Sequence, residues 1–241
     1  MRTSICKKIS IGCAVVLILC ALSAMTSQGQ TIIPRIGMTL SRTTWSWSDR
    51  EQYKVNGELR KGLIIGLAYE TSLKEGPFVF QTELTYIEKG FKETVSYPNN
   101  VDKHDYSFKF LEVPVILKAE LGTGKIKFLP HLGLSVAYAL EGDRNRSGVY
   151  ANPNTGEISL WTQKNEITFS FSDQQGKRRV GSPLDFGVQT GRGFKLFDKV
   201  IMDLRYSIGL TNFEFIPDES LQNRVIQISA GVPIRIGRTK S

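Results

Sequence analysis

The residues with the greatest capacity for chemistry in this 241-residue chain are four carboxylates and four basic residues that share one face of alternating segments. Two neighbouring carboxylates could act as a general acid and a general base. Equal numbers of acidic and basic groups on one face instead favour ion pairs, because buried charges persist when they are paired. We therefore predict a structural charge network and no catalytic pair. Its members are Arg35, Glu83, Glu112, Lys118, Asp185, Asp203, Arg205 and Arg235.

Histidine occurs only twice, at His104 and His131. Two histidines cannot build a His-rich metal site. A Ser-His-Asp triad would have to combine His104 with Asp102 or Asp105, in a polar link where we expect the histidine to be solvated. The sequence predicts no catalytic residue and no metal site, and we do not expect an enzyme.

Two glycine-containing segments lack the features of a phosphate-binding loop. Gly122-Thr123-Gly124-Lys125 has neither the full spacing nor a following helix, and it is predicted to be a hairpin turn. Gly191-Arg192-Gly193 has no third glycine, and its glycines are predicted to relieve crowding or to permit strand curvature. No cofactor is expected.

Residues 1–29 have the three-part form of a secretory signal. Three basic residues precede an apolar stretch over residues 9–25, and small residues follow it. We expect cleavage before Gln30, which makes residues 30–241 the exported domain. All three cysteines lie in the signal, so the exported domain is predicted to hold neither a disulfide nor a cysteine-ligated metal.

The formal charge of +8 falls to +5 once the three basic residues of the signal are removed. A basic excess of this size requires no nucleic-acid partner, and none is expected for an exported protein.

The exported domain is predicted to consist of strands. Several runs place an apolar residue at every second position, which is typical of a strand with two different faces. The runs cover residues 36–40, 63–69, 78–86, 111–121, 126–140, 184–188, 200–210 and 226–236. No long segment keeps a helical apolar period. About eight strands of this kind are typical of the smallest outer-membrane barrels.

The links between these runs alternate in length. Short turns are expected at residues 74–77, 122–125 and 197–199, and long polar links at residues 47–61, 98–105, 141–183 and 216–223. This pattern predicts an all-β fold, an eight-stranded antiparallel up-and-down transmembrane β-barrel with short periplasmic turns and longer external loops. The link over residues 141–183 is expected to be a long external loop or a pair of strand extensions.

The apolar rows should face lipid, because a lipid-facing Arg or Lys near the middle of the bilayer costs about 2 to 4 kcal/mol. The charged rows then face inward and fill a narrow, non-conducting interior. A soluble periplasmic lipocalin-like barrel around an apolar ligand is the alternative, because alternation does not show which face is inside. That alternative places Val115 and Leu134 inside.

Pro114 lies in the middle of a predicted strand. A closed barrel has no free edge for a residue without an N–H group, so Pro114 should mark a bulge or a break in the ladder of hydrogen bonds.

The run Phe110-Leu111-Glu112-Val113-Pro114-Val115-Ile116-Leu117-Lys118 resembles the outer-membrane beta-barrel family typified by PorT. Members carry an aromatic residue, a Leu-Glu-Ile/Val-Pro run and a closing Lys. Further similar pieces follow in the same order, at residues 81–86 with 89–90, 185–187 with 191–193, and 205–212. The chain departs from such barrels in ending without an aromatic residue.

The resemblance implies an integral outer-membrane protein of a Gram-negative cell that is folded by the barrel-assembly machinery. Some relatives are linked to protein secretion. We therefore expect a non-enzymatic protein of the cell outer membrane with a structural or interaction role. Its expected partners are outer-membrane lipid, the assembly machinery and a protein that binds the external loops. An outer-membrane barrel enzyme is a further alternative, and it would need residues around His104 or Asp185.

Overall fold

The computed structural model describes residues 30–46, 54–73, 76–97, 100–169, 179–180, 183–211 and 220–236. The expected signal over residues 1–29 lies outside this part of the chain, as do portions of the long links. The regular elements of the described residues are strands. None of the described residues belongs to a helix that is long and apolar enough to cross a membrane.

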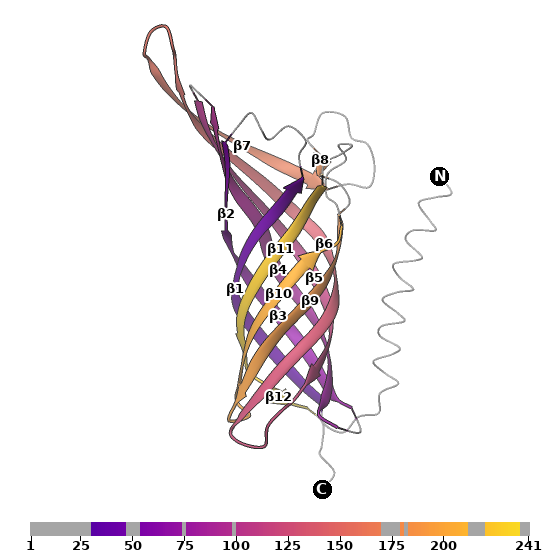
Figure 1. Ribbon diagram of the computed structural model, residues 1–241. Helices are drawn as coiled ribbons and strands as arrows, with labels where there is room; N and C mark the ends of the chain where they lie inside the picture. Colours follow the sequence, from indigo (N-terminus) through magenta and orange to yellow (C-terminus); the bar gives the residue numbers. More distant parts are fainter. Residues whose placement is uncertain are drawn as a thin grey trace, which may run out of the picture.

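Eight long strands close into a ring (Figure 1). They are β1 (Gln30–Ser46), β3 (Arg60–Ser72), β4 (Phe78–Tyr97), β5 (Asn100–Ala119), β6 (Ile126–Ala151), β9 (Leu184–Leu196), β10 (Val200–Gly209) and β11 (Ser220–Gly231). Each strand pairs antiparallel with the next, and β1 pairs with both β3 and β11, so the ring is closed. The predicted eight-stranded antiparallel barrel is confirmed.

Four shorter strands complete the sheet. They are β2 (Lys54–Glu58), β7 (Ile158–Phe169), β8 (Arg179–Val180) and β12 (Ile234–Arg235). β2 pairs with the outer part of β4, β7 pairs with the outer part of β6, and β12 pairs with the start of β1.

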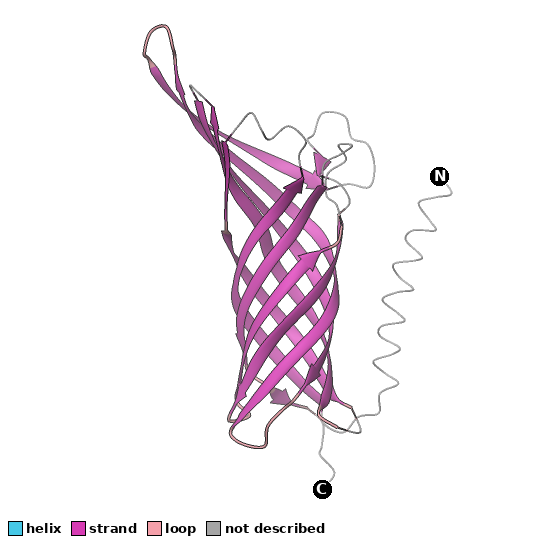
Figure 2. Ribbon diagram, in the orientation of Figure 1, coloured by secondary structure: helices cyan, strands magenta, loops and turns pink. Residues whose placement is uncertain are grey.

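One side of the barrel wall continues outward as an ordered sheet (Figure 2). We call it the external sheet: β2, β7 and residues 92–97 of β4, 100–109 of β5 and 141–151 of β6. Within the long link over residues 141–183, strands therefore cover residues 141–151 and 158–169. The turn between them is held by Asn152, whose Oδ1 accepts a hydrogen bond from the Asn154 backbone N at 2.9 Å.

The apolar face of the barrel wall points outward and the charged face points inward, as a membrane barrel requires. Ile36, Leu132 and Leu134 point outward and are 60%, 60% and 64% exposed. Glu83 and Arg205, on the opposite face of their strands, are 4% and 1% exposed. The position of Leu134 contradicts the lipocalin-like alternative, which requires it inside.

Pro114 interrupts the ladder on one side of β5 only. The pairing of β4 with β5 stops after Thr82↔Val115 and resumes in the same register at Thr85↔Glu112. On the other side, the pairing with β6 is regular, with Pro114 opposite Ser135. The missing N–H group thus breaks the ladder, as predicted, without a bulge at this position.

A bulge does occur higher in the wall, between β5 and β6. Lys109 lies opposite Glu141 and Phe110 lies opposite Ala139, which leaves Leu140 as the extra residue. One extra residue reverses the facing of all that follow, because side chains alternate along a strand. Ala139 is accordingly buried before the bulge and Gly142 after it, while Leu140 and Glu141 are both exposed.

The substitution Leu134→Arg tests whether the face of the barrel wall that carries Leu134 contacts lipid. It should lower the free energy of unfolding in phospholipid vesicles by about 2 to 4 kcal/mol, because Leu134 lies in the middle of an apolar row. Leu160→Arg on the external sheet is the matched control and should change it by less than about 0.5 kcal/mol. Urea titration of both variants measures the difference. Equal effects at the two positions would contradict a lipid-facing Leu134.

Candidate functional site

Three layers of side chains fill the interior of the barrel. An apolar cluster of Ile33, Ala68, Leu129 and Ile201 lies toward the end that carries the short turns. A second cluster lies toward the external sheet, and its aromatic members are Phe91, Tyr106, Phe108 and Phe110, with Phe169 packed against it. Charged side chains occupy the space between the two apolar layers.

Glu83 of β4 is the central carboxylate of the charged layer. It forms an ion pair with Arg35 of β1, and its Oε1 lies 3.0 Å from Nη2 of Arg205 of β10. Asp203 completes the group, because its Oδ1 lies 3.4 Å from Arg35 and 3.4 Å from Arg205. Gln81 also donates a hydrogen bond to Glu83. Two arginines and two carboxylates therefore alternate across the lumen.

A second group surrounds Lys89 of β4. Its Nζ lies 2.5 Å from Glu112 and 3.5 Å from Asp185. Asn223 donates to Asp185 at 3.1 Å, and Gln189 donates to Glu112. The same Gln189 accepts a hydrogen bond from Arg205 at 3.2 Å, so it joins the two groups.

Lys118 and His131 complete the charged layer. Nζ of Lys118 lies 2.9 Å from Oε1 of Glu70, and both side chains are nearly buried. Nε2 of His131 lies 3.8 Å from Asp203, while its Nδ1 lies 3.1 Å from the carbonyl oxygen of Leu129. The Nδ1 contact fixes the orientation of the His131 ring in the wall, while Nε2 has no hydrogen-bond partner.

The lumen contains seven of the eight residues predicted for the network. They are Arg35, Glu83, Glu112, Lys118, Asp185, Asp203 and Arg205. Arg235 is an exception: it lies in β12, opposite Thr31, and it is exposed. Arg235 belongs to the inward row by alternation, but it lies at the rim of the barrel and is exposed.

Lys89 was missed by the sequence analysis. The signal that could have found it is the alternation of β4, in which Val79, Glu83 and Lys89 all fall on the buried face.

Among the described residues, His104 does not contact the aspartates of the candidate Ser-His-Asp triad. Its Nδ1 lies 3.0 Å from Oε1 of Glu93. The aspartates that neighbour it in sequence have other partners: Asp102 lies 3.3 Å from Arg146, and Asp105 lies 3.0 Å from Arg60. Within the described ranges there is also no group of three or more side chains able to hold a metal ion.

The inner face of the external sheet is organised by cationic side chains over aromatic rings. The guanidinium of Arg144 lies 5.2 Å from the ring centre of Tyr106, and that of Arg146 lies 5.1 Å from the ring centre of Trp161. Trp161 lies against Gly148, where a Cβ atom would come within 2.6 Å of the indole. These contacts give the sheet a fixed packing of its own.

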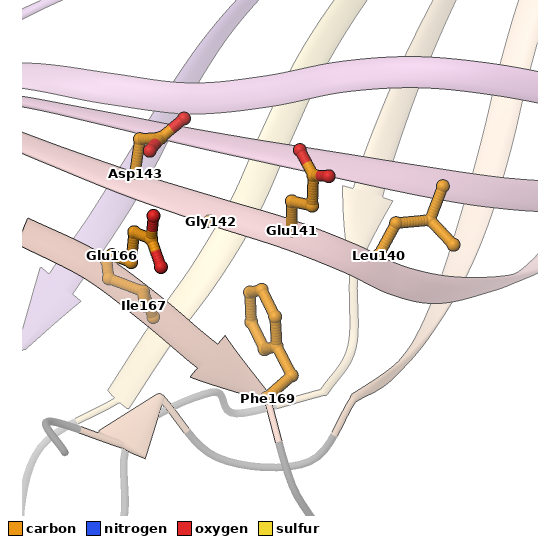
Figure 3. Close-up of a pocket in the computed structure, with 7 residues that line it drawn as sticks. All are labelled: Leu140, Glu141, Gly142, Asp143, Glu166, Ile167 and Phe169. Carbon is orange, nitrogen blue, oxygen red and sulfur yellow. The ribbon is translucent and has the colours of Figure 1, made fainter.

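A cavity of about 310 Å³ lies beside the β6 bulge (Figure 3). Its polar lining consists of Glu141, Asp143 and Glu166. Asp143 lies directly opposite Glu166, and Lys164 lies 3.7 Å from Asp143. Lys109 donates a 2.7 Å hydrogen bond to Glu141, which holds the pKa of that carboxyl below its ordinary value. The cavity is lined by three carboxylates, and two of them are paired to lysines.

The network around Glu83 predicts a large effect of Glu83→Gln. The free energy of unfolding should fall by about 3 to 5 kcal/mol, because Arg35 and Arg205 would stay buried with one counter-charge fewer. The double variant Glu83→Gln, Arg205→Met should recover part of the loss, and Glu157→Gln at the hairpin tip is the control. Urea unfolding in micelles measures all three. A loss for Glu83→Gln no larger than that of the control would show that the pairing does not matter.

Comparisons with known proteins agree with this architecture. The family described as outer membrane protein beta-barrel domain matches residues 28–214. No curated protein matches the chain.

The solved structures that match the chain show only distant similarity. The attachment invasion locus protein Ail of Yersinia pestis is 13% identical, with 86% of this chain and 99% of that chain covered and a TM-score of 0.39. Neisserial surface protein A is 12% identical, with 86% and 97% covered and a TM-score of 0.38. OprG of Pseudomonas aeruginosa is 9% identical, with 86% and 97% covered and a TM-score of 0.39.

The family match over residues 28–214 includes seven of the eight strands of the closed ring, and the apolar rows of that ring face outward. The chain therefore belongs to the outer membrane protein beta-barrel domain family, and it is a protein of the outer membrane.

Proposed function

We propose that this protein is a non-conducting, non-enzymatic membrane anchor that presents the external sheet to a protein partner outside the cell. The observation that carries the proposal is the order of that sheet: β4, β5 and β6 run without interruption from the barrel wall into it. A rigid scaffold that carries exposed residues is a common basis for binding.

The partner surface is expected at the tip of the β6–β7 hairpin. Ile158 and Leu160 are 67% and 78% exposed, and Val149 lies directly opposite Leu160 on the same face. Large apolar side chains that stand clear of the membrane gain free energy when a partner removes them from water. Clusters of this kind often mark a protein interaction site.

The packing of the lumen supports the absence of a pore. The apolar layer at one end and the aromatic cluster at the other enclose the charged layer, whose side chains pair across the lumen. A link to protein secretion rests on the PorT resemblance alone.

The first test is electrical. The purified protein, inserted into a planar lipid bilayer, should produce no steady conductance, because its own side chains occupy the lumen. A porin inserted in the same membrane serves as the positive control. Regular conductance steps from the protein alone would contradict a closed interior.

The second test locates the partner surface. A photo-crosslinking residue in place of Leu160 should give one discrete adduct on intact cells, because the tip is expected to be buried by the partner. The same residue in place of Gln163 on the opposite face of β7 should give none, and Leu160→Asp should weaken binding of the captured protein by about tenfold. Failure to form an adduct at Leu160, or equal adducts at both positions, would contradict a partner surface at the hairpin tip.

A further inference from the structure

Two arginines lie directly opposite each other on the outer surface of the barrel. Arg42 of β1 and Arg224 of β11 are partners in the antiparallel register. Both face away from the lumen, because their neighbours in sequence, Ser41 and Val225, are buried inside at 1% exposure. Like charges directly opposite in a sheet are destabilising, so this arrangement needs a counter-charge.

A third cation lies beside the pair. Lys61 of β3 is opposite Leu40, which places it diagonally from Arg42 on the same outer face. β3, β1 and β11 are adjacent strands of the wall (Figure 1). Three cations thus gather at one height across three neighbouring strands.

In the part of the chain that the structure describes, no carboxylate lies within ion-pair distance of these three cations. No ion pair engages Arg42, Arg224 or Lys61 there. Nε of Arg224 is moreover buried and without a hydrogen-bond partner. Elsewhere at the same end of the wall a cation is matched, since Lys109 pairs with Glu141 at 2.7 Å.

The position of the three cations identifies the kind of anion. Directly below the arginines, Leu40 lies opposite Ile226, and below these Met38 and Ile228 are 40% and 44% exposed toward lipid. The cations therefore follow the apolar rows at the end of the barrel that carries the external sheet. In the membrane this is the height of the headgroups of the outer leaflet.

We propose that Arg42, Arg224 and Lys61 form a binding site for the phosphate group of an anionic lipid in the outer leaflet. Guanidinium groups bind phosphate through two parallel hydrogen bonds, and a phosphate between the two arginines cancels their repulsion. The acyl chains lie along Leu40, Ile226, Met38 and Ile228. The site is independent of the partner surface at the hairpin tip.

The test measures the effect of one substitution on the unfolding temperature in two lipid environments, where the effect should have opposite signs. In bicelles of zwitterionic phosphatidylcholine, Arg42→Gln should raise the unfolding temperature, because it removes the repulsion between like charges. In the same bicelles with lipid A added, Arg42→Gln should lower the unfolding temperature relative to the wild type. Arg224→Gln should behave in the same way. Each substitution should weaken retention of lipid A in native mass spectrometry by about fivefold.

Lys103→Gln is the matched control, because Lys103 is an exposed cation of the external sheet and the change in charge is the same. It should leave lipid A retention unchanged. The proposal fails if the arginine variants lower the unfolding temperature in both environments, which indicates a counter-charge from the protein itself, or raise it in both, which indicates that lipid A supplies none. It also fails if inorganic phosphate stabilises the wild type as strongly as lipid A does, or if Lys103→Gln has an equal effect.

Discussion

The pairing of Glu83 with Arg35 and Arg205 is the interaction on which the rest of the barrel depends. These residues come from β4, β1 and β10, so the contacts link parts of the wall that are not neighbours in the sheet. A slip of any strand by one residue would move its charged row to the lipid face, where one Arg costs about 2 to 4 kcal/mol. The charged layer therefore fixes the register of the wall, and a fixed register is what allows its outer face to be apolar.

Alternation in the sequence was enough to predict the barrel and most of its charged interior, because the period of a strand assigns each residue to a face. Alternation could not predict how far along the barrel axis each residue lies. Arg235 lies in the inward row but at the rim, and it is exposed. The break at Pro114 followed from its missing N–H group, whereas the bulge at Leu140 depends on how β5 and β6 pair. The contacts of His104 likewise depend on the pairing of β4, which brings Glu93 opposite it.

The bulge at Leu140 separates the part of β6 whose outer face contacts lipid from the part that belongs to the external sheet. Below it, every second side chain faces lipid, and Leu134 and Tyr138 are 64% and 48% exposed. Above it the facing is reversed, so that Gly142 and Arg144 face the interior and Glu141 faces outward. If β6 alternated regularly through residues 139–141, Glu141 would face inward, in the same row as Ala139. The change from an apolar to a charged outer face therefore occurs within one step of the strand.

The aromatic cluster couples the external sheet to the barrel. Phe169, near the end of β7, packs on Phe108 and Phe110 with ring centres 5.8 and 6.3 Å apart. Phe110 in turn lies beneath Lys89, 5.0 Å from its ring centre, and Lys89 belongs to the charged layer. The sheet cannot pivot at the membrane surface without opening this cluster, and opening it would expose aromatic area to water. A partner held at the hairpin tip would therefore be kept at a fixed distance and angle from the membrane.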